Sequence, residues 1–356
     1  MKTEDIQKIK NLLNLVNFGK PRESIREFEG KEIEAIQFEL PKIIGEELPL
    51  VSIDGSYSIL FSFLGADTWI ALFRIVVTEY KIQVKNGKIY YLINAPPKTF
   101  DHLNLLSFNE FILDSQPEVF SKAAEIATAF QERNPSLFAS NIMSYLEDIT
   151  LEKISETYNN CILLKDGALL TYKALEREPI YKSIILNCRM NDILLAGISK
   201  STSTHFFRDN YTDDFFLKRY YDKKYSNLTY IKIPDTFIER QTKFDAWGKI
   251  HFAKLHKEAY KWFRVDIGND GGNIDKLFSS IAAYSMVKLV PGYPIGLIEA
   301  HKIAKSVRDF KDSYELELIR VLKDMGLSAN DILEGAVDLG GKELSSFHEI
   351  LDQLSR

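Results

Sequence analysis

Cysteine is scarce in this sequence, which contains two in 356 residues, Cys161 and Cys188. Neither lies at a zinc-ligand spacing from a histidine, so neither a disulfide framework nor a zinc knuckle is expected, and we predict that both are core thiols. Positive charge is not in excess either, because 45 Lys and Arg stand against 50 Asp and Glu. Nonspecific affinity for nucleic acid comes from many cationic contacts to phosphate, so any nucleic-acid surface must be local.

Long apolar runs are also missing. None approaches the roughly 20 residues that a membrane helix needs, and the start, MKTEDIQKIKNLLNLV, has no signal-peptide core. We therefore expect a cytoplasmic protein with no membrane contact. A hydrophobic content of 45% is enough for a substantial core, and no fixed-period repeat or low-complexity linker requires a separate second domain.

The first half of the chain predicts β-hairpins behind a helical preface. Residues 1–45 combine helical periodicity with a Lys- and Glu-rich stretch. Asn86-Gly87 is a type I′ hairpin signal between two strand-like runs. From Leu48 onward the strand-like segments are LPLVSID, SILFSFL, WIALFRIVVTEYKIQV and KIYYLINAP.

In the second half, helices are predicted to alternate with strands. The chain is expected to turn helical after Pro96-Pro97 through about residue 158, again over 172–192, and from Asn273 onward. Apolar strands lie between these helices: NNCILLKDGALL, LLAGISK and three candidates within 229–267.

Hairpins first, then strands separated by helices, predict an α/β fold with a mixed sheet flanked by helices, in the outline of an RNase H-like domain. We place this domain at residues 46–309. Helical extensions are expected on either side of it, at 1–45 and 310–356.

Two acidic residues follow apolar strands in the same local context. Asp54 comes after LVSI and Asp166 after ILLK, and each precedes a glycine, which permits close approach of the backbone. Both are candidate metal-binding carboxylates at the exposed end of a buried strand. Since Asp and Gly are also turn formers, the alternative for each is an ordinary turn.

Two further candidates lie on predicted helices. On a helix over about 140–158, Glu147 shares a face with apolar residues, whereas its neighbour Asp148 is expected to point elsewhere. A carboxylate on an apolar stripe needs a metal or a salt bridge, and both stay open for Glu147. His301 lies in the predicted helix of PGYPIGLIEAHKIAKSVRD, at the edge of its apolar face. It is either a metal ligand or a packed residue that makes hydrogen bonds.

Basic residues supply candidates for phosphate binding. Lys200 ends LLAGISK and precedes four hydroxyl residues, so it offers a cation to a phosphate or merely faces water. The stretch 240–264 holds seven Lys or Arg, among them Lys254 and Arg264, interleaved with aromatic residues. Such a pattern suits a surface that follows a nucleic-acid backbone and stacks bases. A β-hairpin with aromatics in the core and lysines outside gives the same pattern.

Five segments together resemble the NurA nuclease family. IDGS alone is common, whereas DGxL, GISKS and GYPxxLxEAHK in this order form a specific combination. The matching segments, in the family's order, are VSIDGS (51–56), ILLKDGALL (162–170), LLAGISKS (194–201), FRVDI (263–267) and GYPIGLIEAHKIA (292–304).

The resemblance implies an RNase H-like deoxyribonuclease that depends on Mn²⁺ or Mg²⁺, with two ions, and processes DNA ends in the 5′–3′ direction. It also implies a homodimer that docks onto a hexameric HerA-like ATPase, in DNA end resection and repair or in defence against phage. In the family's motifs, Asp54 matches the first metal-binding aspartate, Asp166 the DGxL aspartate and His301 the EAHK histidine. Glu147, aligned by position alone, completes the implied metal ligands.

Further roles are implied for residues of the same segments. Lys200 matches the lysine of the family's GISKS strand and would offset charge on the phosphate. Asp266, in FRVDI, is a possible additional acid at a position where family members also carry one. The residues expected at the DNA are Lys200, Lys254, Arg264 and Tyr293.

Two rival functions remain. A non-catalytic DNA-binding adaptor of a translocase would keep the fold, but the retained acids argue against it. Another RNase H-like nuclease, such as a junction resolvase, would use similar carboxylates. The GYPIGLIEAHK segment favours the NurA pattern over this second rival.

Overall fold

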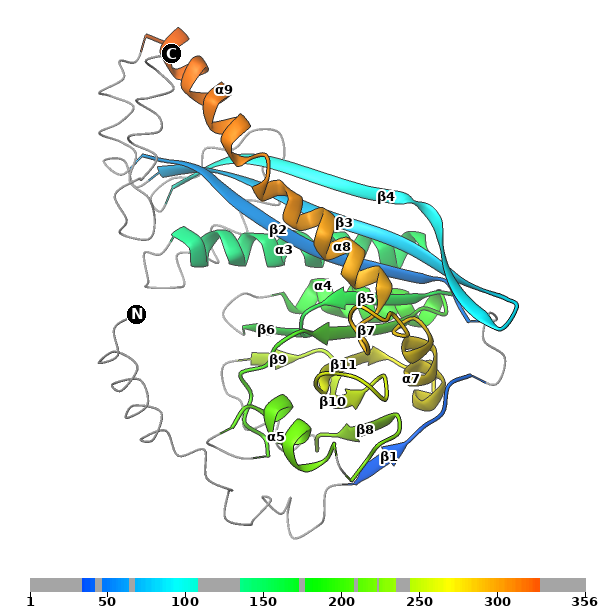
Figure 1. Ribbon diagram of the computed structural model, residues 1–356. Coiled ribbons are helices and arrows are strands. Elements are labelled where there is room, and N and C mark those ends of the chain that lie inside the picture. Colours follow the sequence, from blue (N-terminus) through cyan, green and yellow to red (C-terminus); the bar gives the residue numbers. More distant parts are fainter. Residues whose placement is uncertain are drawn as a thin grey trace, which may run out of the picture.

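The computed structural model describes residues 34–41, 47–63, 68–107, 135–172, 177–207, 211–222, 224–234 and 244–326. Within these residues a nine-stranded sheet runs in the order β1-β8-β10-β11-β7-β5-β2-β3-β4 (Figure 1). Only the pairs β2/β5 and β5/β7 are parallel, so the sheet is mixed, as predicted. Its strands are β1 (Ala35–Gln37), β2 (Leu50–Phe63), β3 (Thr68–Lys85), β4 (Lys88–Ser107), β5 (Ile162–Asp166), β7 (Leu194–Ser199), β8 (Thr229–Lys232), β10 (Lys249–Lys254) and β11 (Phe263–Asn269). Two short strands, β6 (Leu170–Tyr172) and β9 (Phe244–Ala246), form a separate antiparallel pair.

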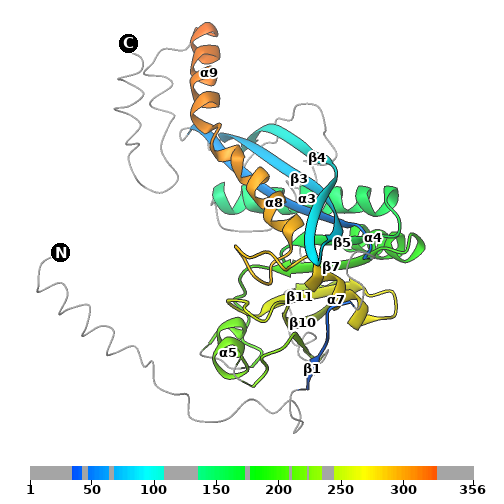
Figure 2. The ribbon, with the colours of Figure 1, turned by 45° about the vertical axis from the view of Figure 1, so that its right-hand side comes forward.

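Helices cover both faces of the sheet (Figure 2). One face packs against α3 (Pro135–Thr157) and α4 (Glu178–Met190), and the other against α7 (Ile274–Ala283) and α8 (Ile295–Lys305). A further helix, α5 (Asp213–Tyr220), packs on β8 and β10. After α8 come a 3₁₀ turn, η3 (Ser306–Arg308), and α9 (Lys311–Asp324), in agreement with the helical structure predicted from Asn273 onward.

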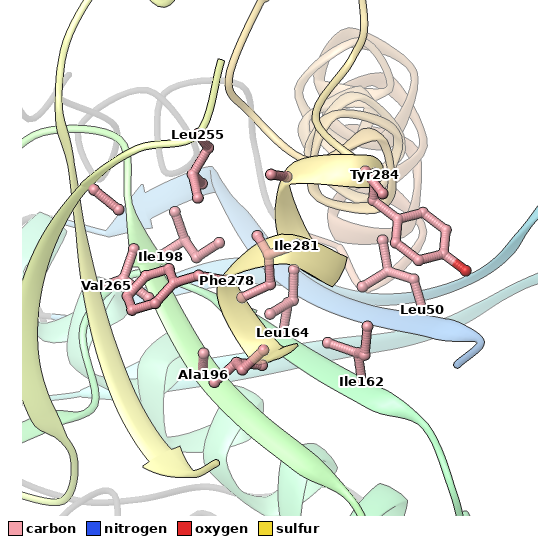
Figure 3. Close-up of a cluster of buried hydrophobic side chains, with 14 of the residues drawn as sticks. Leu50, Ile162, Leu164, Ala196, Ile198, Leu255, Val265, Phe278, Ile281 and Tyr284 are labelled. Atoms are coloured by element: carbon pink, nitrogen blue, oxygen red, sulfur yellow. The ribbon is translucent and has the colours of Figure 1, made fainter. Parts of the chain in front are cut away.

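The parallel strands are apolar on both sides because helices bury both of their faces. Along β5, Leu163 belongs to the cluster under α3 and α4, while Ile162 and Leu164 belong to the cluster under α7. Figure 3 shows this second cluster, in which Phe278 and Ile281 of α7 pack against the central strands. The site described below lies where these buried strands end.

The β3–β4 hairpin forms as its turn residues predict. Asn86 and Gly87 have φ values of 53° and 70°, and Lys85 pairs with Lys88. Positive φ at both central positions is the requirement of a type I′ turn. The hairpin continues as a long ribbon with β2, which extends beyond the parallel part of the sheet (Figure 1).

Two expectations about secondary structure are wrong. Pro96 and Pro97 lie inside β4, so the chain does not turn helical there. Proline is tolerated at a sheet edge, and β4 is the last strand of the described sheet. Residues 35–37 form β1, paired with β8, instead of a helix, because Ile36, Phe38 and Leu40 alternate with polar residues at the strand period. The rest of the predicted N-terminal helix, residues 108–134 and residues 327–356 lie wholly or mainly outside the described residues.

Both cysteines are buried free thiols, as expected. Among the described residues, no helix is long and apolar enough to cross a membrane.

Candidate metal centre

Asp54 and Asp166 lie side by side where β2 and β5 separate. The parallel pairing runs from Leu50 with Ile162 to Ile53 with Lys165, so the next residue on each strand is one of these aspartates. β5 ends at Asp166, whereas β2 continues to Phe63. Asp54 is therefore in the middle of a strand, and neither the predicted strand end nor the alternative of a turn holds there. Ligand sites are typical of the carboxyl ends of parallel strands.

Helix α8 brings His301 to Asp54. A Cβ at Gly296 would lie 2.3 Å from Ser52 Oγ, so only glycine lets the start of α8 rest on β2. Five helical residues from Gly296 span about 7.5 Å, close to the roughly 6.6 Å from Ser52 to Asp54 along the strand. His301 Nδ1 consequently lies 2.7 Å from Asp54 Oδ2, and 45% of the His301 side chain stays exposed.

Ligand atoms of Asp54, Asp166 and His301 all lie within 4.8 Å of one another. The Lys200 ammonium contacts both carboxylates: it pairs closely with Asp166 and lies 3.5 Å from Asp54 Oδ2. The Tyr293 hydroxyl donates to Asp166 Oδ1 at 2.8 Å. A positive group thus already lies where the two carboxylates converge, which is the arrangement that a bound cation requires.

The pKa of Asp166 is raised to about 6 because burial disfavours its charge and Asp54 is close, although Lys200 and Tyr293 act in the opposite direction. The pKa of Tyr293 is raised by burial and by the Asp166 charge, so its hydroxyl keeps its proton. The charge of Asp54 opposes the ionisation of Asp166, and a divalent cation beside both carboxylates would offset this repulsion.

Glu147 of α3 reaches the same region from the other side of β2. Its Oε1 would lie 2.8 Å from a Cβ at Gly55, so glycine makes room for the carboxylate beside the strand. The side chain is buried, with Lys165 Nζ 3.7 Å from Oε2. Burial and the neighbouring acids raise the pKa of Glu147 to about 8, despite the charge of Lys165. Without a cation, Glu147 is therefore largely a neutral acid at pH 7.

Asp148 points elsewhere than Glu147, as expected, but it is not the residue without a partner that the sequence suggested. Its carboxylate is fully buried and accepts from Lys165, Arg177 and Tyr181. The expectation assumed one buried face, but α3 packs against both the sheet and α4. The lysine within the apolar strand ILLKD could have indicated a buried acid, because a buried lysine needs a partner of opposite charge.

Asp54, Asp166, Glu147 and Lys200 line a cavity of about 420 Å³. His301 and Tyr293 bond to the two aspartates but are not among its lining residues. One wall comes from α3, and the opposite wall comes from the ends of β5 and β7 with the loops that follow them. The lining residues are Asp54, Ser140, Met143, Ser144, Glu147, Lys165, Asp166, Gly167, Ala168, Ser199, Lys200 and Ser201. A cavity of this size suits a small ligand or one residue of a polymer.

Three other predicted site residues lie away from both the cavity and the cluster of Asp54, Asp166 and His301. Lys254 is buried and paired with Asp222 at 2.8 Å. Arg264 is also buried and binds Asp266 through two hydrogen bonds, of 2.8 and 2.9 Å. Asp266 also accepts from the Leu169 amide at 3.0 Å, so it anchors the loop after Asp166 and does not itself face the site.

Lys254 and Arg264 are buried because the strands that carry them pack their aromatic neighbours into the core. Phe252 and Trp262 are fully buried, and β10 pairs with β11 as an antiparallel hairpin. The alternative of a hairpin with aromatics in the core and lysines outside therefore holds for Phe252 and Trp262 but not for Lys254, which is buried. Residues 240–243 lie outside the described residues.

The donor set fits a hard divalent cation. Two carboxylates and one imidazole, with a third carboxylate in the same cavity, match the oxygen-rich preference of Mn²⁺ and Mg²⁺. No thiol lines the cavity, which argues against a soft-metal site.

Comparison with known proteins finds no matching family model and no matching curated protein. Among solved structures, the NurA nuclease from Sulfolobus solfataricus has a TM-score of 0.48 and 12% identity over 92% of this chain and 99% of that chain. A second NurA structure has the same score and identity over 92% and 98%. The A. aeolicus Argonaute has a TM-score of 0.28 and 12% identity over 76% of this chain and 29% of that chain.

Proposed function

We propose that this protein is a metal-dependent deoxyribonuclease of the NurA type. The observation that carries the proposal is the convergence of Asp54, Asp166 and His301 within 4.8 Å, at positions that match the family's motifs. The RNase H-like character of the domain at 46–309 is part of the proposal. It is supported by the sheet order β4-β3-β2-β5-β7, in which a β-hairpin ribbon precedes parallel strands separated by helices.

The residues of the site have distinct roles in phosphodiester hydrolysis. Asp54, Asp166 and His301 hold Mn²⁺ or Mg²⁺, and Glu147 supplies the further carboxylate that two ions need. Bound there, the cations supply an activated water and stabilise negative charge on the phosphate. Lys200, with 36% of its side chain exposed, leaves the aspartates and neutralises the phosphate. Tyr293 holds Asp166 in place through its hydroxyl. Its side chain is buried and leaves little surface for the DNA contact that the sequence predicted.

The substrate is DNA, processed at its ends in the 5′–3′ direction. Docking onto a HerA-like hexameric ATPase, a homodimeric state and a role in end resection, repair or phage defence rest on the motif resemblance alone. Co-purification with such an ATPase and sedimentation of the protein alone test the partner and the dimer separately.

Cleavage of end-labelled DNA tests the proposed function. We expect the wild type to cut single- or double-stranded DNA with Mn²⁺ and to stop on addition of EDTA. Asp54→Asn should cut at least about 100-fold more slowly, since even the loss of a metal's outer partner costs 10- to 100-fold. Lys302→Ala, on the exposed side of α8, is the matched control. Equal rates for wild type and Asp54→Asn would refute the site. DNA binding without cleavage in any divalent metal would favour the adaptor.

A further inference from the structure

A buried ionic cluster lies directly behind the cavity. Its centre is Asp148, whose Oδ1 accepts from Lys165 Nζ at 2.5 Å and from the Tyr181 hydroxyl at 2.9 Å. Oδ2 accepts from Arg177 Nη1 at 2.7 Å. The side chains of Asp148, Lys165 and Arg177 are at most 5% exposed. The cluster therefore joins α3, β5 and the residue that precedes α4.

Two of these elements, α3 and β5, each contribute one residue to the cluster and the adjacent residue to the site. On α3, Asp148 belongs to the cluster and Glu147 lines the cavity. On β5, Lys165 belongs to the cluster and also lines the cavity, and Asp166 follows it with the opposite side-chain direction. The ion pair between Asp148 and Lys165 thus lies one residue away from two acids on separate elements.

Stability alone does not account for this cluster. A buried ion pair is often no more stabilising than apolar residues of similar volume, because removing two charges from water is costly. The same elements are already held together by apolar packing, in which Leu146, Leu151 and Leu163 are fully or almost fully buried. What the ion pair adds is a fixed distance and direction between α3 and β5.

We propose that Asp148 and Lys165 are positioning residues that hold Glu147 and Asp166 in the arrangement needed to bind the cations. Lys165 contacts both acids of α3, since its ammonium is 2.5 Å from Asp148 and 3.7 Å from Glu147. Neither residue takes part in bond breaking. This inference rests on the proposed function and adds to it the residues that set the geometry of its metal site.

Three variants separate positioning from stability. The triple variant Asp148→Leu/Lys165→Met/Arg177→Met replaces the charges with apolar side chains of comparable length. Asp148→Asn keeps the shape of the side chain and removes its charge, for the case in which the triple variant does not fold. Tyr181→Phe is the control, because it removes the hydroxyl's hydrogen bond to Asp148 and the long one that it accepts from Lys165, and leaves both ion pairs. The readouts are the melting temperature without metal, the Kd for Mn²⁺ by calorimetry without DNA, and kcat and KM for DNA.

We expect a folded triple variant whose Kd for Mn²⁺ rises and whose kcat falls by about 10- to 100-fold, as for other residues that orient metal ligands. KM for DNA should stay unchanged. Asp148→Asn should likewise raise the Kd for Mn²⁺ and lower kcat without changing KM. Tyr181→Phe should keep a Kd and a kcat within about twofold of the wild type, because it leaves the ion pairs that fix the distance between α3 and β5. A folded triple variant or Asp148→Asn with wild-type Kd and kcat would overturn the inference. If the wild type binds Mn²⁺ without cutting DNA, the proposed function fails, and the Kd comparison still decides the positioning role. A wild type that binds no Mn²⁺ overturns both.

Discussion

Gly55 and Glu147 are in direct contact across the gap between β2 and α3. A Cβ at position 55 would lie 2.8 Å from Glu147 Oε1 and 3.1 Å from its Cγ. The glycine after Asp54 is thus neither a turn residue nor a backbone hinge, because it continues β2. Its lack of a side chain is what lets a carboxylate of α3 come close to a carboxylate of the sheet.

Gly55→Ala should displace Glu147 and lower both stability and activity. Overpacking of this kind costs about 1–3 kcal/mol, measurable by denaturant unfolding. In the background of Glu147→Ala the same substitution should cost less, since one of its two closest contacts is gone. A coupling energy of about 0.5–3 kcal/mol between the two sites is expected for residues in contact. Additive effects would show that Gly55 does not make room for Glu147.

Glu147→Gln should stabilise the metal-free protein at alkaline pH. A carboxyl group with a raised pKa binds more protons in the folded state, so its contribution to stability falls as pH rises from about 4.5 to about 8. The amide imitates the neutral acid and does not titrate. The melting temperature of the variant should therefore match the wild type near pH 4.5 and exceed it increasingly up to pH 8, in EDTA.

Mn²⁺ should make the wild type more stable than Glu147→Gln, because only the ionised carboxylate binds a cation. At pH 8 with saturating Mn²⁺, the wild type should be stabilised more than Glu147→Gln. An identical pH dependence for both proteins in EDTA would contradict a buried, titrating Glu147.

His301→Asn should weaken Mn²⁺ binding and leave the fold unchanged. The imidazole is 45% exposed and contacts Asp54, so its loss creates little cavity but removes one ligand. We expect the Kd for Mn²⁺ to rise at least 10-fold, as for disturbance of a metal's surroundings. Calorimetry measures this, with the exposed Lys302→Ala on the same helix as control. Equal Kd values for His301→Asn and Lys302→Ala would exclude the histidine as a ligand.

Lys200→Gln should separate metal binding from catalysis. The ammonium competes with a cation for Asp54 and Asp166, so its removal should lower the Kd for Mn²⁺. If Lys200 then neutralises the phosphate, kcat should fall by about 10²- to 10³-fold, as on removal of a group that stabilises developing charge. Tighter Mn²⁺ binding with an unchanged kcat would limit Lys200 to a counterion of the metal-free site.

Local sequence rules predict much of this sheet, and the reasons are visible in particular residues. The turn at Asn86-Gly87 and the apolar strands β5 and β7 depend on chemistry within a few residues. The break expected at Pro96 fails because a sheet edge tolerates proline, which depends on the position of β4 in the sheet.

Some residues of the site can be predicted from the sequence and others cannot, because their roles depend on contacts between distant elements. Asp54, Asp166 and His301 carry motifs, and the structure brings all three together. Asp148 was dismissed on a helical projection, because a projection contains no α4. Lys254 and Arg264 have the right charge for DNA, but both are buried and paired with an aspartate. The partner of Lys254, Asp222, is distant in sequence, whereas that of Arg264, Asp266, lies two residues along on the same face of β11 and could have been found.

Anomalous X-ray diffraction from crystals soaked in Mn²⁺ tests the central claim most directly. The account predicts an anomalous peak within about 2.3 Å of oxygens of Asp54 and Asp166 and of a nitrogen of His301, allowing for the usual ligand distances. The Lys200 ammonium should have moved away from both carboxylates, and Asp54→Asn crystals should lack the peak. A saturating soak that leaves the space between Asp54 and Asp166 without a peak, with Lys200 still bound to both, would contradict it.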